Sequence, residues 1–79
     1  MRVVRETSKE GIRISLFEWN NKYLLKFDSG MAEQTFKVPA IDVLDEKDFD
    51  QLFEGQFFEN VKERFDEMHQ SLHIALENI

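Results

Sequence analysis

Two histidines near the end of this 79-residue chain have the spacing of a metal site. His69 and His73 lie four residues apart, which places both imidazoles on one side of a helix, as in many zinc sites. Asp66 and Glu77 fall near the same side and would complete a ligand set. No Glu directly follows the first His, so the metalloprotease helix motif is absent. The pattern favours two histidines at the edge of a packed surface, bonded to neighbouring carboxylates, and we expect no metal.

A run of carboxylates between residues 42 and 54 is the other cation-binding candidate. A calcium loop needs oxygen ligands at alternate positions, a central glycine and a distal Glu. This segment instead carries Phe49, Leu52 and Phe53 at helical spacing and has no glycine at a sharp turn. The run therefore indicates the solvated acidic face of a helix.

The residues available for catalysis are few. The chain has no cysteine, and its three glycines are too far apart to build a phosphate-binding loop. None of the serines follows a strand in the sharp strand-to-helix turn that exposes a nucleophile. We therefore expect a protein that is not an enzyme, with no catalytic residue and no cofactor.

The charge of the chain restricts its partners. Ten basic and sixteen acidic residues give a formal net charge of −6. Such a surface repels nucleic acid and anionic lipid, so we expect neither nucleic acid nor membrane as a partner, whereas a basic protein would be attracted. The first ten residues lack the apolar core of a signal peptide, and no apolar run approaches the roughly 20 residues that span a bilayer. We expect a cytoplasmic protein.

The first half of the chain alternates apolar and polar residues with the period of two that is typical of strands. This alternation predicts four strands in an antiparallel meander, with Pro39 ending the last one. The predicted strands cover residues 2–7, 12–19, 22–28 and 33–38.

The strand pairing can be predicted from the turns. With Asn20-Asn21 as a two-residue turn, Trp19 lies opposite Lys22, and apolar residues then face each other on both sides of the sheet: Leu16 faces Leu25 and Phe17 faces Leu24. For the last strand, we expect Lys26 opposite Glu33. This register places Tyr23 opposite Phe36.

The second half of the chain predicts two helices. Asp45 is a suitable N-cap, and the apolar residues after it form two sets on opposite sides of a helical wheel. One straight helix cannot bury both sets against one sheet, so we predict a short helix at 46–54, a break at Gly55 and a long helix at 56–78. Together, the elements predict a single α+β domain over residues 1–79.

The long helix carries an apolar stripe that runs to the last residue. At 1.5 Å per residue the helix measures about 35 Å, whereas strands of seven residues span about 23 Å. The stripe would therefore overhang the sheet, and its steps of three and four residues are typical of helix–helix seams. We predict a homodimer whose seam contains Phe65, Met68, Leu72, Leu76 and Ile79, with His69 and His73 along its margin. The alternative is a helix that crosses the sheet diagonally and frays in its last turn.

Phe17, Trp19 and Leu24 share one sheet face, opposite the face that we expect the long helix to cover. Three large apolar side chains together indicate an interface patch or the wall of a ligand groove. The alternative is that the short helix folds over this face and covers them.

These features favour an interaction module: a homodimer that binds another protein, in the manner of an acidic inhibitor or chaperone-like partner of a basic protein. The alternative is a regulatory domain that binds a small molecule or metal in a groove between sheet and helix. That alternative requires Trp19, Tyr23, His69 and His73 to converge on one concavity.

Overall fold

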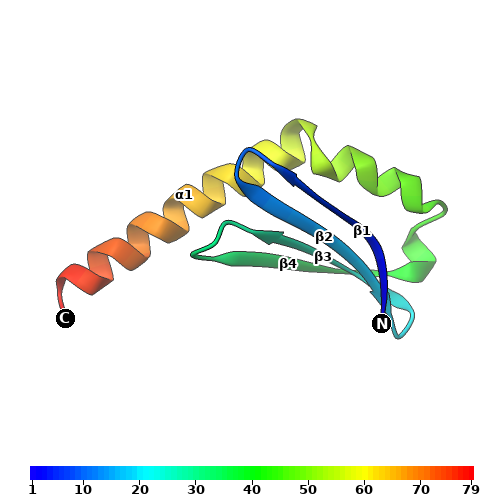
Figure 1. Cartoon of the computed structure of the whole chain (residues 1–79), viewed down its shortest axis with the longest axis horizontal. Helices are drawn as coiled ribbons and strands as arrows, with labels where there is room; N and C mark the ends of the chain where they lie inside the picture. Colours follow the sequence, from blue (N-terminus) through cyan, green and yellow to red (C-terminus); the bar gives the residue numbers. More distant parts are fainter.

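The computed structural model describes all 79 residues and confirms the predicted α+β fold, with one sheet layer and one helical layer (Figure 1). The sheet is antiparallel, and its strands pair in sequence order. They are β1 (Arg2–Lys9), β2 (Ile12–Trp19), β3 (Lys22–Asp28) and β4 (Glu33–Pro39). Two 3-10 helices, η1 (Ala40–Asp42) and η2 (Glu46–Phe53), lead into the long helix α1 (Gly55–Glu77).

The first two hairpins close with two-residue turns. Asn20 and Asn21 have φ angles of 57° and 64°, which is the left-handed pair that matches the twist of a hairpin. The predicted register of β2 and β3 is confirmed, with Trp19 opposite Lys22 and Leu16 opposite Leu25. The strand β1 continues to Lys9, beyond the predicted end, because residues 10 and 11 alone make its turn.

The predicted register of β4 is wrong by two residues. Glu33 lies opposite Asp28, and Lys26 lies opposite Thr35. The cause is a tight turn, in which the Ser29 amide donates to the Ala32 carbonyl at 3.0 Å. A shift of two residues leaves each side chain on its predicted face, and Lys26 still reaches Glu33 at 3.3 Å.

The core lies between one face of the sheet and both helical segments. Gly55, with φ of +72°, turns the chain between η2 and α1, so that the two apolar sets cover the same sheet face. The predicted break is therefore confirmed, although the first segment is a 3-10 helix. The core residues are Ile12, Ile14, Leu16, Tyr23, Leu25 and Phe27 from the sheet and Phe49, Phe53, Phe58, Val61 and Phe65 from the helices.

The helix α1 extends past the β3–β4 turn as a projecting arm, and the molecule measures 46 × 26 × 19 Å (Figure 1). From Asp66 onward every residue is exposed except His69, which is half-buried. The predicted overhang is therefore present, and the sheet of the chain does not cover the helix up to its last turn, as the alternative requires. No helix is both long enough and apolar enough to cross a membrane.

Candidate interaction surfaces

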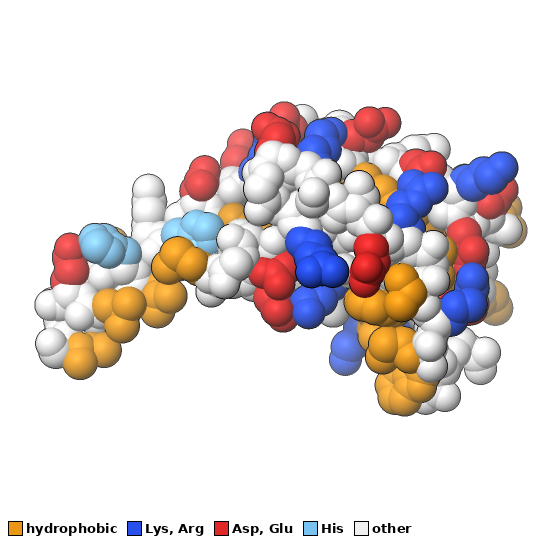
Figure 2. Space-filling model, in the orientation of Figure 1, with side chains coloured by type: hydrophobic (Ala, Val, Ile, Leu, Met, Phe, Trp, Pro, Cys, Tyr) orange, Lys and Arg blue, Asp and Glu red, His pale blue; other side chains and the backbone are white.

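The projecting arm carries the apolar stripe into solvent. We call Phe65, Met68, Leu72, Leu76 and Ile79 the helix stripe; Phe65 is buried in the core, and the other four are 37%, 42%, 55% and 97% exposed. Hydrophobic side chains line the lower edge of the arm in Figure 2. The stripe thus begins in the core of the protein and ends uncovered.

Only the base of the arm is attached to the sheet. The His69 Nε2 atom lies 2.9 Å from the Ser29 hydroxyl in the β3–β4 turn, and the imidazole stacks on Phe65 with ring centroids 6.0 Å apart. The Gln34 amide donates to the Val61 carbonyl at 2.9 Å. Residues 70–79 form no hydrogen bond or ion pair with any other element.

A depression of about 640 Å³ lies beside the helix stripe, at the base of the arm. Gln34 of β4 forms one side of it. The other side belongs to α1 and consists of Arg64, Glu67, Met68, Ser71, Leu72 and Ala75. The depression is therefore a shallow concavity between the sheet edge and the stripe.

The two histidines have separate roles. His69 pairs with a serine hydroxyl, where the sequence predicts a carboxylate, and exposed His73 pairs with Glu77 at 3.0 Å. No three His, Cys, Asp or Glu side chains lie close enough together to hold a metal ion.

The second sheet face is uncovered, and the alternative in which the short helix covers it is wrong. Phe49 and Phe53 of η2 are buried in the core, on the opposite side of the sheet. We call Val3, Phe17, Trp19 and Leu24 the open-face patch. Val3 and Trp19 are exposed, and Phe17 and Leu24 are half-buried. Val3 pairs with Phe17, and Phe17 pairs with Leu24. Trp19 is 49% exposed, and the Lys22 ammonium lies 5.9 Å from the centre of its ring.

The groove expected by the regulatory-domain alternative does not form as predicted. Trp19 belongs to the open face, whereas Tyr23 is buried in the core against Phe49. His69 lies at the far end of the sheet, beside the β3–β4 turn. Trp19 and Tyr23 therefore lie on opposite faces of the sheet, and both histidines lie on α1 at the arm, so the four residues do not converge.

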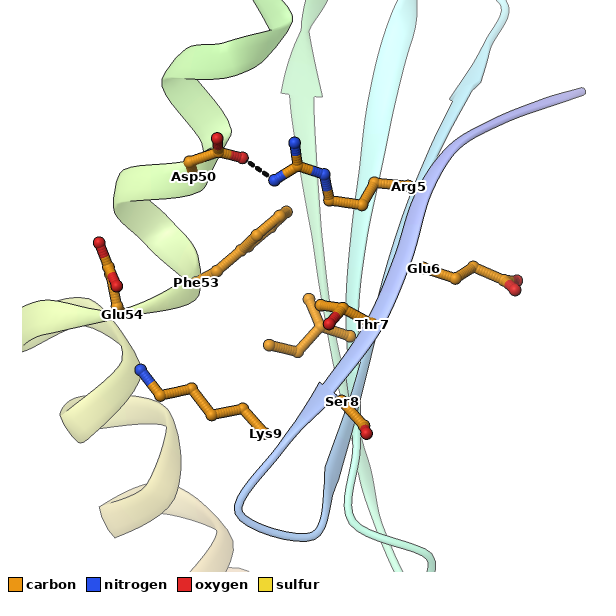
Figure 3. Close-up of a pocket in the computed structure, with 9 residues that line it drawn as sticks. Arg5, Glu6, Thr7, Ser8, Lys9, Asp50, Phe53 and Glu54 are labelled. Atoms are coloured by element: carbon orange, nitrogen blue, oxygen red, sulfur yellow. Dashed lines mark hydrogen bonds and ion pairs between the residues drawn. The ribbon is translucent and has the colours of Figure 1, made fainter.

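A cleft of about 550 Å³ separates β1 from η2 (Figure 3). Arg5 bonds to Asp50 across it and lies over the Phe53 ring, 5.5 Å from its centre. Lys9 points toward the start of α1, where its ammonium lies 5.0 Å from the centre of the Phe58 ring, whereas Glu6 and Ser8 point away (Figure 3). The contacts of Arg5 with Asp50 and Phe53 hold β1 against η2 across this cleft.

A second polar cluster attaches the N-terminal end of β1 to η2. The Tyr23 hydroxyl donates to Glu46 at 3.1 Å, and Arg2 bonds to both Glu46 and Glu18. Burial raises the pKa of Tyr23 above its ordinary value, and the bond to Glu46 raises the pKa further. Sequence reasoning missed this cluster because its residues are far apart in the chain.

Some exposed apolar side chains also escaped the sequence analysis. Ile41 and Leu44 are 89% and 99% exposed, and Ile74 projects from α1 on the side away from the helix stripe. The helical wheel already separates Ile74 from Leu72 by about 200°. Ile41 and Leu44 lie between predicted elements, where no periodic pattern applies.

The fold and these surfaces define a small α+β protein with two prominent apolar surfaces, one on the projecting arm and one on the open sheet face. Comparison of the chain with protein-family models, curated proteins and solved structures found no match to any of them.

Proposed function

We propose that this protein is a non-enzymatic protein–protein interaction module that forms a homodimer through the helix stripe. The observation that carries the proposal is the continuous passage of the stripe from the buried Phe65 to the exposed Ile79. An isolated helical segment as short as the arm is marginal in water. A second copy offers an identical apolar stripe, and a two-fold dimer would cover both at once.

The shape of the protomer favours an antiparallel pair of arms. The stripe faces the side on which the sheet packs, so a second helix must lie in the layer of the sheet, beyond the β3–β4 turn (Figure 1). A parallel partner would direct its own N-terminal half into the first sheet. An antiparallel partner places its sheet at the opposite end, and opposed helix dipoles favour the same arrangement.

The stripe also suggests a register for the pair. With Leu72 on the two-fold axis, Met68 lies opposite the partner's Leu76. The partner's Ile79 lies level with Phe65, which is buried in the core of its own protomer. The last turn of the partner then fits into the depression beside Gln34. This arrangement would fill a concavity that the protomer leaves open.

The exposed area of the helix stripe suits a weak dimer. The four exposed stripe residues present on the order of 400 Å² per protomer, so the pair covers about 800 Å², below the roughly 1,200 Å² of a stable interface and within the range of weak, transient ones. Lost translational and rotational freedom and the ordering of side chains oppose association, so buried area alone does not set the affinity. For an apolar interface of this small size we expect a weak dimer, with a dissociation constant of roughly 10–100 μM.

The proposal includes a further protein partner. The net charge of −6 favours a basic one, since complementary charge speeds encounter. The open-face patch offers this partner a second apolar surface, separate from the arm. An acidic inhibitor or a chaperone-like protein is the kind of module that fits these features.

Sedimentation velocity from 1 μM to 500 μM tests the dimer, with Ile74→Glu as the matched control. Leu72→Glu places two carboxylates beside the two-fold axis and should leave a monomer throughout this range. Ile74→Glu adds the same charge on the opposite side of the same helix and should dimerise like the wild type. Both positions are exposed in the protomer, so neither change should unfold it. A wild-type chain that stays monomeric at 500 μM would refute the dimer.

A further inference from the structure

A small pocket of about 170 Å³ lies where the end of β4 meets η2. Val38, Val43, Phe49 and Leu52 supply its apolar lining, and Asp42, Asp48 and Gln51 complete it. Such a volume corresponds to about five or six waters, well below the roughly 300–1,000 Å³ of pockets for small-molecule ligands. It therefore suits one unbranched side chain.

Four carboxylates of this acidic segment divide into two groups. Glu46 and Asp50 bond to Arg2 and Arg5 and hold η2 against β1. Asp42 and Asp48, at the pocket, take part in no ion pair and accept no side-chain hydrogen bond. The charge at the pocket is therefore available to a cation from outside the chain.

The loop beside the pocket presents apolar side chains to solvent. Ile41 and Leu44 flank Asp42 and Val43 in sequence, and almost all of their surface is exposed. A neighbouring chain that places a side chain in the pocket would also cover these two residues. This end of the molecule thus combines an apolar pocket, free negative charge and exposed apolar flanks.

We propose that the pocket binds an arginine or lysine side chain of the basic partner. The aliphatic stem packs on Val38, Val43 and Leu52, and the cationic head lies between the carboxylates of Asp42 and Asp48. The planar guanidinium group of arginine suits two carboxylates better than an ammonium group does. The inference rests on the proposed function in that the protein binds other proteins, and it does not depend on the dimer.

The test is an NMR titration of the full chain, carrying Leu72→Glu so that self-association plays no part. The probe is the peptide acetyl-Leu-Ala-Arg-Ala-Leu-amide, compared with the same peptide containing lysine or citrulline. Citrulline keeps the shape of arginine and removes its charge. We expect shift changes centred on Val38, Val43 and Leu52, with arginine binding most tightly, lysine next and citrulline about tenfold more weakly than arginine.

Charge-neutralising variants provide the matched control. Asp42→Asn with Asp48→Asn should weaken arginine-peptide binding about tenfold. Glu63→Gln with Asp66→Asn removes the same charge from exposed positions on α1 and should leave the affinity within twofold. Equal affinity for the arginine and citrulline peptides, equal effects of the two variants, or shifts centred elsewhere would each overturn the inference. Because the protein is monomeric in this test, a failure here leaves the sedimentation result standing, and the converse also holds.

Discussion

Engineered cysteines can determine how the two arms pair, because the chain has no cysteine of its own. Paired helices lie 8–10 Å apart, and Cα atoms stand about 2.3 Å from each helix axis. Two Cα atoms that face each other across the two-fold axis are then about 3.4–5.4 Å apart, which overlaps the roughly 4.4–6.8 Å that a disulfide bridges. Leu72→Cys should therefore cross-link to its own copy under mild oxidation.

Mixtures of two variants distinguish the antiparallel pair from a parallel one. With Leu72 on the axis, position 68 lies level with the partner's position 76, whereas two copies of position 68 lie about 12 Å apart along the helix. Met68→Cys mixed with Leu76→Cys should form the mixed dimer in high yield, and each variant alone should cross-link poorly. A parallel pair would give the opposite result.

The assay is non-reducing gel electrophoresis after oxidation at 100 μM, with Ile74→Cys as the control for random collision. Ile74 is exposed on the far side of the helix and should cross-link only at the background rate. If Leu72→Cys cross-links no faster than Ile74→Cys, the helix stripe is not the seam. Efficient cross-linking of Met68→Cys and of Leu76→Cys, each alone, would retain the dimer and refute its direction.

Two further predictions concern the protomer. Because the pKa of Tyr23 is raised above 10.0 by burial and by the bond to Glu46, the neutral phenol stabilises the fold fully below pH 10 and loses this contribution as pH rises through the folded-state pKa. Urea unfolding from pH 7 to 11 should show the wild type losing stability more steeply above pH 10 than Tyr23→Phe, and parallel curves would contradict this assignment. Gly55→Ala should lower the free energy of unfolding by about 1 kcal/mol in urea at pH 7, because a φ of +72° is unfavourable for alanine. The cost should be no larger, because the added Cβ would meet no atom within 4 Å. A neutral or stabilising effect would show that the break carries no strain.

The registers show what a sequence pattern can and cannot decide. The β2–β3 pairing followed from a two-residue turn, because Asn20-Asn21 leaves a single register in which apolar residues face each other. For β4, two registers that differ by two residues place the same side chains on the same face. Burial alone could not choose between them, and the choice was made by the hydrogen bonds of the Ser29–Ala32 turn.

The surfaces that could be predicted depend on residues close together in the sequence, and those that could not depend on residues far apart. The overhang of the helix stripe was predictable because periodicity and length are local properties of residues 57–79. The side of the sheet that η2 covers was not predictable, because it depends on the packing of Phe49 and Phe53 with core residues of β2 and β3, which are distant in the sequence. The pocket between Val38 and Leu52 escaped prediction for a related reason: its walls come from separate elements.

The rigid arm connects the fold of the protomer to the geometry of the proposed assembly. Between Gln56 and Ile79 the chain has no glycine or proline, so α1 has no residue that would readily bend it. The sheet that buries Phe58 and Val61 therefore sets the direction of the arm. The acidic pocket beside η2 lies at the opposite end of the protomer from the arm (Figure 1). An antiparallel dimer would place its two pockets at its far ends, a spacing that favours a partner with two basic sites held apart over one with a single site.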